Sequence, residues 1–250
     1  TSALAADAVW FNSKFHMNSF LEALVKFLKS MPDFQPLEVT EIIRTKSAVH
    51  PPGIADLLPL PEREPGPLRI LWAARWEHDK NPELFFEAIE ILKANGIQFK
   101  LSVIGQSFRD RPDVFAKAHH RFADHIDHWG YQKTRSDYEL VLQQSDVIVS
   151  TADHEFFGIS VIEAVAAGAY PLVPNRLSYP EILGLTQVEN AEQFFYDGSP
   201  SDLANKLGRL AACVDKGGLF PAAINPEILT GRFKWKNLAH LYDRALEQIR

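Results

Sequence analysis

A regular alternation of short apolar runs and amphipathic helical patterns is the feature that most constrains the fold of this chain. The apolar runs carry few charges, which is typical of strands buried on both faces of a parallel sheet. They cover residues 8–12, 68–73, 99–104, 126–129, 147–150 and 170–173. Between them, apolar residues recur at helical spacing and predict helices that include residues 20–31, 82–94, 138–144 and 159–167. Strands that alternate with helices predict an α/β fold with a doubly wound parallel sheet.

Two helix starts carry explicit signals. Asn81 followed by Pro82 predicts a capped helix start, and Gly96 predicts the end of the same helix. Ser136, with Glu139 three residues later, matches a capping box and predicts that the next helix begins there.

The composition is that of a globular protein. Hydrophobic residues make up 46% and charged residues 23% of the 250 residues, which excludes a disordered or low-complexity chain. The net charge of −6 argues against non-specific binding of nucleic acid by the whole surface. The single cysteine, Cys213, excludes an internal disulfide, and no apolar run is long enough to span a membrane. These features together predict a cytoplasmic protein.

A proline-rich stretch at residues 51–67 divides the chain. It predicts a linker, because prolines lack the amide hydrogen that a sheet interior needs. Residues 1–50 hold about one strand and one long helix, so we expect only the remnant of a domain there. Because the chain lacks an initial Met and enters a strand-like run almost at once, we expect it to be cut from a longer protein. Residues 68–250 are predicted to form a complete α/β domain.

The strongest local signal lies where the strand at 147–150 leads into the next helix. That helix begins with Gly158, Ile159 and Ser160, whose free N–H groups suit a phosphate. Glu155 precedes it in the loop, and Glu163 follows within it, where a carboxylate could accept hydrogen bonds from sugar hydroxyls. Since open α/β sheets bind ligands at the carboxyl ends of their strands, the pattern predicts a site for a phosphorylated sugar. An acidic loop before an ordinary surface helix is the alternative.

A second signal follows the strand at 68–73, again at a carboxyl end. Arg75 offers a planar guanidinium and Lys80 a point charge, and two cations on one loop can grip a pyrophosphate. A charged surface loop is the alternative, although Trp76 is unusual in such a loop.

A third segment, Trp129, Gly130 and Tyr131, ends the strand at 126–129 and could hold a nucleobase at the same sheet edge. A core aromatic residue with a turn glycine is the alternative. The sequence lacks a G-x-G-x-x-G fingerprint, a P-loop and a G-x-S-x-G elbow. The clustered histidines at 119, 120, 125 and 128 lack the spacing of a zinc motif, so no metal site is predicted.

Together these residues resemble the retaining nucleotide-sugar glycosyltransferases of the GT-B fold. Glu155 and Glu163, with Gly158 between them, look like the E-x7-E motif of that family, and Arg75 with Lys80 looks like its diphosphate-binding pair. The resemblance implies that residues 68–250 are the Rossmann-like donor-binding domain. It also implies that residues 1–50 are a remnant of the acceptor-side domain, and that a final helix at about 235–248 crosses back to that domain.

The resemblance implies a role for each matched residue. Arg75 and Lys80 would neutralise the leaving diphosphate, and the start of the helix would offer it the N–H groups of Gly158, Ile159 and Ser160. Glu155 would accept a hydrogen bond from the donor sugar, and Glu163 would hold the ribose. The base would lie beside Trp129, Gly130 and Tyr131. No metal or other cofactor is implied, because cations and a helix dipole stabilise the departing charge. The sequence departs from the family pattern at Ala74, where Gly often stands, and at Phe156, where Pro often stands.

Two strings point to a narrower resemblance. WAARWEHDK at residues 72–80 and FNSKFHMNSFL at residues 11–21 are similar to the tRNA-queuosine mannosyltransferase family. This resemblance implies transfer of a hexose, mannose, from GDP-mannose to queuosine in tRNA, with retention. Two alternatives stay open. One is a non-catalytic nucleotide-sugar-binding module, and the other is a UDP-sugar transferase or an epimerase of the same fold.

Overall fold

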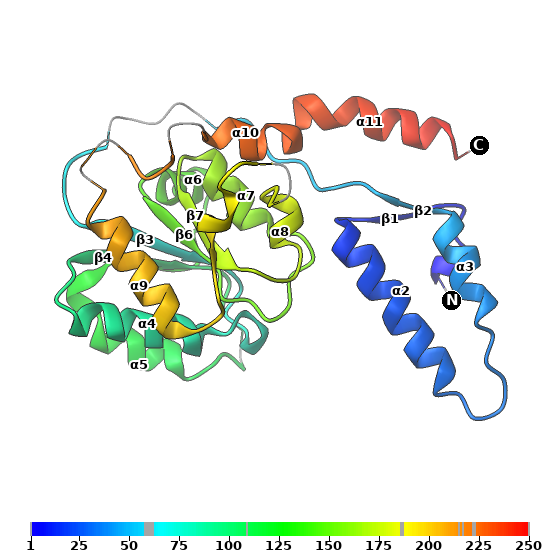
Figure 1. The fold of residues 1–250 in the computed structure, drawn as a ribbon, viewed down its shortest axis with the longest axis horizontal. Helices are drawn as coiled ribbons and strands as arrows, with labels where there is room; N and C mark the ends of the chain where they lie inside the picture. Colours follow the sequence, from blue (N-terminus) through cyan, green and yellow to red (C-terminus); the bar gives the residue numbers. More distant parts are fainter. Residues whose placement is uncertain are drawn as a thin grey trace. The chain divides into compact units, whose positions relative to one another are not determined.

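The structure is a computed structural model that describes residues 2–57, 63–108, 110–185, 188–214, 216, 218–221 and 224–249. The chain forms two compact units, one of residues 56–231 and one of residues 1–55 together with 232–250 (Figure 1). Residues 58–62 of the predicted linker lie outside the described residues. The domain boundaries drawn from the sequence, 1–50, 51–67 and 68–250, stay predictions.

A six-stranded parallel sheet forms the centre of the larger unit, in the order β5-β4-β3-β6-β7-β8. The strands are β3 (Leu68–Ala73), β4 (Phe99–Ile104), β5 (Ile126–Gly130), β6 (Val147–Val149), β7 (Tyr170–Pro174) and β8 (Phe195–Tyr196). β6 and β7 are buried throughout, as their continuous apolar runs require. The predicted doubly wound α/β fold is confirmed. Only β8 was not expected among these strands, because two residues are too short to show a pattern.

Helices cover both faces of this sheet (Figure 1). They are α4 (Pro82–Ala94), α5 (Val114–Arg121), α6 (Arg135–Gln143), α7 (Ile159–Ala166), α8 (Tyr179–Ile182), α9 (Pro200–Ala211) and α10 (Pro226–Thr230), with 3-10 turns at His78–Lys80, Ala123–His125 and Ala191–Phe194. α4 packs against α5 and α9, and α7 packs against α6 and α10. In the part of the chain that the structure describes, none of the helices has both the length and the apolar character needed to cross a bilayer.

The starts of two helices test the predicted boundary signals. Asn81 caps α4 by accepting the N–H three residues later at 3.2 Å, and Pro82 is the first helical residue, so that prediction is confirmed. The capping box predicted at Ser136 is wrong. Thr134 is the cap instead, because its backbone is extended and its hydroxyl accepts the N–H three residues later at 3.0 Å. The earlier start places Arg135 in the first turn of α6, at the carboxyl edge of the sheet.

Among its described residues, the smaller unit holds a two-stranded parallel sheet and four α-helices. They are β1 (Val9–Phe11), β2 (Ser47–Val49), α1 (Ser2–Ala5), α2 (Lys14–Lys29), α3 (Glu38–Thr45) and α11 (Trp235–Glu247). β1, α2 and α11 agree with the predicted elements, whereas β2, α1 and α3 are additional. The Tyr242 hydroxyl of α11 shares its one hydrogen between the carbonyls of His50 at 3.1 Å and Pro51 at 2.9 Å. These bonds join the last helix to the segment that follows β2.

Candidate functional site

The strand order creates a crevice at one edge of the larger unit's sheet. From β3 the chain builds outward through β4 to β5, and then returns to place β6 on the other side of β3. Ligands of open α/β sheets bind at such a reversal, outside the carboxyl ends of the strands. The loop after β3 carries Arg75 and Lys80, and the loop after β6 carries Glu155. The topology therefore brings two separate sequence signals to one edge.

A cavity of about 670 Å³ lies at this edge. Its volume falls within the range of small-molecule sites, roughly 300–1,000 Å³. The described residues that line it are Ala73, Ala74, Arg75, Lys80, Ile104, Gly105, Gln106, Tyr131, Gln132, Lys133, Thr134, Arg135, Tyr138, Glu155, Ile159 and Ser160. The site residues predicted from the sequence that meet there are Arg75, Lys80, Tyr131, Glu155, Ile159 and Ser160.

Lys80 is held in place by the loop that follows β6. The residue is 8% exposed, and its ammonium donates to the His154 carbonyl at 2.5 Å. The same ammonium lies 3.5 Å from the Glu155 carboxylate and 3.2 Å from that of Asp79. The Thr151 hydroxyl donates to the Lys80 carbonyl at 2.7 Å and fixes the backbone. An ammonium has three N–H donors, so these three oxygens hold the charge in one position.

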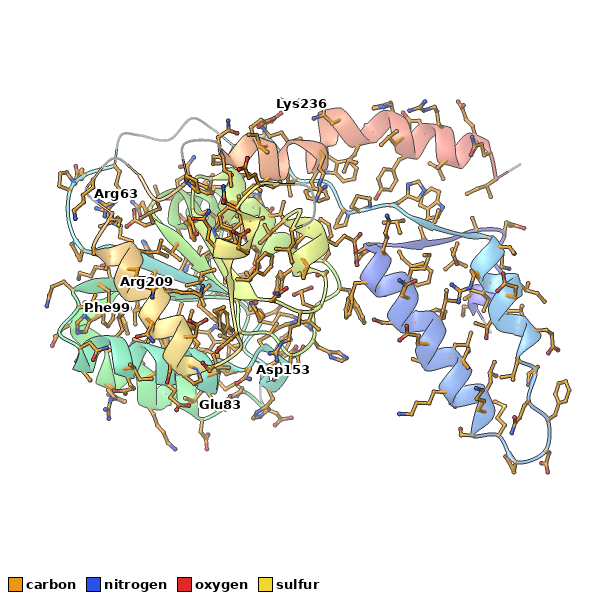
Figure 2. All side chains as sticks on the ribbon, viewed as in Figure 1. Arg63, Glu83, Phe99, Asp153, Arg209 and Lys236 are labelled. Atoms are coloured by element: carbon orange, nitrogen blue, oxygen red, sulfur yellow. The ribbon has the colours of Figure 1, made fainter. Side chains whose placement is uncertain are left out.

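Asp153, labelled in Figure 2, ties the same two loops together. Its backbone N–H donates to the Asp79 carbonyl at 2.9 Å. Its carboxylate accepts hydrogen bonds from Asn81 at 3.1 Å and from Arg176 at 2.6 Å. Because Asn81 is also the cap of α4, this network connects the loop after β6 to the start of that helix. The loops around Lys80 are thus ordered by the protein's own contacts.

Arg75 is more free to change partners. Its side chain is 56% exposed, and its guanidinium pairs with Glu77 at 3.1 Å. An exposed ion pair of this kind contributes only about 0–1 kcal/mol. Reorienting the guanidinium toward an anion in the cavity would therefore cost little.

Two close approaches fix the start of α7, one against Tyr179 of α8 and one against the end of β3. Gly158 has a φ of 84°, and a Cβ there would lie 2.9 Å from the ring of Tyr179, so the position requires glycine. The Ser160 hydroxyl donates to the Ala73 carbonyl at 2.8 Å. The first N–H groups of a helix lack intrahelical acceptors and carry partial positive charge. They provide a place for an anion at the same edge as Lys80.

Glu155 turns back on its own loop. Its Oε1 accepts the N–H groups of Phe156 at 3.0 Å and Phe157 at 3.3 Å, while Oε2 lies near Lys80. A proline at position 156 would lack the first of these donors. The departure from the family pattern at Phe156 therefore adds a hydrogen bond that orients the Glu155 carboxylate.

Gly105 is a site residue that is not predicted from the sequence. Its φ is 150°, and a Cβ there would lie 1.7 Å from the Ala74 carbonyl oxygen. The backbone after β4 therefore passes directly against the backbone after β3, and both residues line the cavity. In the sequence, the signal for this site residue is a single glycine directly after the strand, and no recognisable motif surrounds it.

Glu163 lies outside the described lining but is bonded to two residues within it. The residue is 9% exposed and accepts hydrogen bonds from Arg135 Nη1 and from the Tyr138 hydroxyl, both at 2.8 Å. Burial and the charge of Glu163 raise the pKa of Tyr138, which keeps its hydroxyl protonated as a donor. Burial lowers the pKa of Arg135, and its hydrogen bonds to Glu139 and Glu163 raise it by more. Neither partner is predicted from the sequence, because each contact joins α6 to α7.

The structure places the predicted base-binding segment in two environments. The Trp129 ring packs against Trp76, with centroids 5.3 Å apart, and against His119 at 5.0 Å, and it is not among the described residues of the cavity wall. The ring is half-buried in this aromatic cluster, and its role beside a base stays a prediction. Gly130 ends β5, and its carbonyl accepts a backbone N–H from the loop after β4 at 3.2 Å. Tyr131 alone of the three lines the cavity and is 67% exposed.

Within the described ranges, no group of three or more His, Cys, Asp or Glu side chains is placed to hold a metal ion.

Comparison with protein families identifies the kind of protein to which this cavity belongs. The model of the glycosyl transferases group 1 family matches residues 61–214, more than half of the chain. The chain belongs to the group 1 glycosyl transferases. A second model, of the tRNA-queuosine alpha-mannosyltransferase N-terminal region, matches residues 1–54 of this transferase. The resemblance predicted from the sequence motifs is confirmed.

The chain matches only part of the length of its curated relatives. Over 192 residues the chain is 35% identical to the tRNA-queuosine alpha-mannosyltransferase of Drosophila melanogaster, which covers 72% of this chain and 51% of that protein. Over 182 residues it is 24% identical to the GDP-mannose:cellobiosyl-diphosphopolyprenol alpha-mannosyltransferase of Komagataeibacter xylinus, covering 72% and 45%. The chain thus spans about half the length of the curated relatives it matches.

Solved structures agree on the fold. The pneumococcal O-GlcNAc transferase GtfA in complex with UDP and GlcNAc aligns with a TM-score of 0.72 at 15% identity, over 100% of this chain and 46% of that one. Anabaena Alr3699/HepE in complex with UDP and glucose aligns with a TM-score of 0.71 at 16% identity, over 97% and 64%. At these identities the likeness shows the fold, which is that of GT-B glycosyltransferases.

Proposed function

We propose that this chain is the donor-binding part of a mannosyltransferase that moves mannose from GDP-mannose to queuosine in tRNA, with retention. Its 35% identity to a tRNA-queuosine alpha-mannosyltransferase and the match of residues 1–54 to that family's N-terminal model support the acceptor. A second relative is named for GDP-mannose, which supports the donor. Retention follows from the family resemblance. The cytoplasmic location stays a prediction.

The balance of charge around the cavity carries this proposal. Its described lining holds three basic side chains, Arg75, Lys80 and Lys133, against one acidic side chain, Glu155, besides Arg135, whose charge Glu163 balances. Arginine and lysine bind phosphate through charge-assisted hydrogen bonds, which are the strong class of hydrogen bond. A site for a neutral sugar alone would have no use for this excess. A ligand with a diphosphate beside its sugar fits both the cations and the carboxylate.

In this proposal, Lys80 and Arg75 neutralise the diphosphate as it leaves, together with the N–H groups of Gly158, Ile159 and Ser160. Negative charge grows on the diphosphate while the sugar–phosphate bond loosens. Cations that are already in position stabilise this transition state more than the ground state, and that difference accelerates the reaction. The ammonium of Lys80 meets this requirement by giving up only its longest contact, the one to Glu155 at 3.5 Å, which frees one N–H for the diphosphate.

In this proposal, two carboxylates and an aromatic ring bind the sugar, the ribose and the base of the donor. Glu155 would accept a hydrogen bond from a sugar hydroxyl at Oε2, because its contact with Lys80 at 3.5 Å is long and easily exchanged. Glu163 would hold the ribose. Tyr131, with the Gly130 backbone before it, would lie beside the base.

A thermal-shift screen of this chain with GDP, UDP, ADP and CDP tests the donor. We expect the largest rise in Tm with GDP. A ligand at 100 times its Kd adds about 2.7 kcal/mol, which is about 5–11 °C for a chain of this size. A larger rise with UDP would favour a UDP-sugar transferase or an epimerase, and no rise with any nucleotide would contradict the proposal.

A transfer assay tests the reaction. Because the chain spans about half the length of its curated relative, the proposal implies a longer transferase, and that transferase is incubated with radiolabelled GDP-mannose and tRNA that carries queuosine. Label on the tRNA is the expected result, and the same tRNA without queuosine is the matched control. Binding of GDP-mannose without transfer would favour the non-catalytic binding module instead.

A further inference from the structure

Glu163 has both carboxylate oxygens hydrogen bonded beside the cavity. Oε1 accepts from Arg135 Nη1 and Oε2 from the Tyr138 hydroxyl, each at 2.8 Å. We propose that Arg135 and Tyr138 are positioning residues, which hold this carboxylate as the acceptor for both ribose hydroxyls of the donor and so make the site select ribonucleotides. This inference rests on the proposed function, because it requires a nucleotide in the cavity.

The helix geometry brings the carboxylate to the cavity wall. Glu163 stands three and four positions after Ser160 and Ile159 on α7, so the three side chains share one face of the helix. Ser160 and Ile159 line the cavity, as do Arg135 and Tyr138. The Glu163 side chain retains an exposed fraction of 11%, so the carboxylate is not sealed off. It borders the cavity between residues that form its wall.

The hydrogen-bonding capacity of the carboxylate matches a diol. Each carboxylate oxygen can accept two hydrogen bonds. Arg135 takes one position on Oε1, and Tyr138 takes one position on Oε2. One position on each oxygen is then left for the 2′ and 3′ hydroxyls of a ribose. The two protein partners and the two ribose hydroxyls would all be donors, and the four acceptor positions of the carboxylate suffice for all of them.

Arg135 also solves an electrostatic problem. A nearly buried carboxylate without a partner is costly, and its charge would repel the diphosphate of the same donor. The guanidinium compensates that charge and is itself anchored, since its Nε donates to Glu139 at 2.7 Å. A planar guanidinium bonded at two edges holds its direction better than a flexible ammonium would. The carboxylate is thereby held in one orientation at small cost to anion binding.

Calorimetric titration with GDP and 2′-deoxy-GDP tests the inference. We expect the wild-type chain to bind GDP about tenfold to a hundredfold more tightly than 2′-deoxy-GDP, because a hydrogen bond to a charged group contributes about that much. The ratio of the two Kd values is the quantity compared between variants. Tyr138→Phe removes one hydroxyl, and Arg135→Gln removes one charge. In both, the ratio should fall to about threefold or less, with Arg135→Lys retaining part of it. The matched control is Arg121→Gln, whose ion pair with Glu90 lies outside the cavity wall, and it should keep the wild-type ratio.

The outcomes separate this inference from the function on which it rests. If Tyr138→Phe and Arg135→Gln bind GDP and keep the wild-type ratio, the inference is overturned and the proposed function stands. A wild-type ratio near one also overturns it. Failure of the wild-type chain to bind GDP overturns both. If circular dichroism shows that Arg135→Gln is unfolded, Tyr138→Phe, which retains its ring, decides the question.

Discussion

Replacing Lys80 by Met should reduce the free energy of nucleoside-diphosphate binding more than it reduces the free energy of unfolding. Met fills much of the same volume and removes only the ammonium. The oxygens that lose a partner belong to His154, Glu155 and Asp79. The Glu155 and Asp79 side chains are 27% and 37% exposed, so water can replace the lost contacts. We therefore expect a loss of about 1–2 kcal/mol in the free energy of unfolding.

The loss of binding should be larger because nothing replaces the charge inside the cavity. A charge-assisted hydrogen bond to phosphate is worth about 1.5–3 kcal/mol, which raises the Kd for GDP by about tenfold to 150-fold. Isothermal titration calorimetry measures this change, and urea unfolding measures the stability. Lys100→Met is the control, since its ammonium pairs with Asp127 at 3.4 Å outside the described cavity wall. A Kd for Lys80→Met within about twofold of the wild-type value would refute the reasoning.

Three further predictions concern stability and are checked by thermal unfolding. Gly105→Ala should cost about 3 kcal/mol or more and lower Tm by about 6–12 °C, because its Cβ would overlap the Ala74 carbonyl. Thr134→Ala should cost about 1 kcal/mol by removing the cap of α6, while Thr134→Ser should retain it. Burial lowers the pKa values of His16 and His50 below 6.5. The unfolded chain then binds more protons than the folded chain, so stability should fall as the pH drops below about 6.5. The double variant His16→Gln with His50→Gln should show a smaller difference in Tm between about pH 5 and about pH 7.5 than the wild-type chain.

Elements with long, local patterns could be predicted from the sequence, and short or ambiguous ones could not. β3 and β4 are mostly apolar runs, interrupted only by Arg69, Lys100 and Ser102, and their observed bounds equal the predicted ones. β8 has two residues and shows no pattern. At the start of α6, Thr134 and Ser136 are both hydroxyl residues followed three positions later by an acid. Local chemistry permits either as the cap, and the fold uses Thr134.

The sequence by itself determined which groups are available at the site. Arg75, Lys80 and Glu155 follow parallel strands, and the carboxyl ends of such strands share one edge whatever the details of packing. Only the tertiary structure decided that the Trp129 ring belongs to an aromatic cluster, and that Glu163 is held by residues 28 and 25 positions away on another helix. Local patterns record interactions between near neighbours in the chain. A contact between α6 and α7 depends instead on how two helices pack, and no short stretch of sequence carries that information.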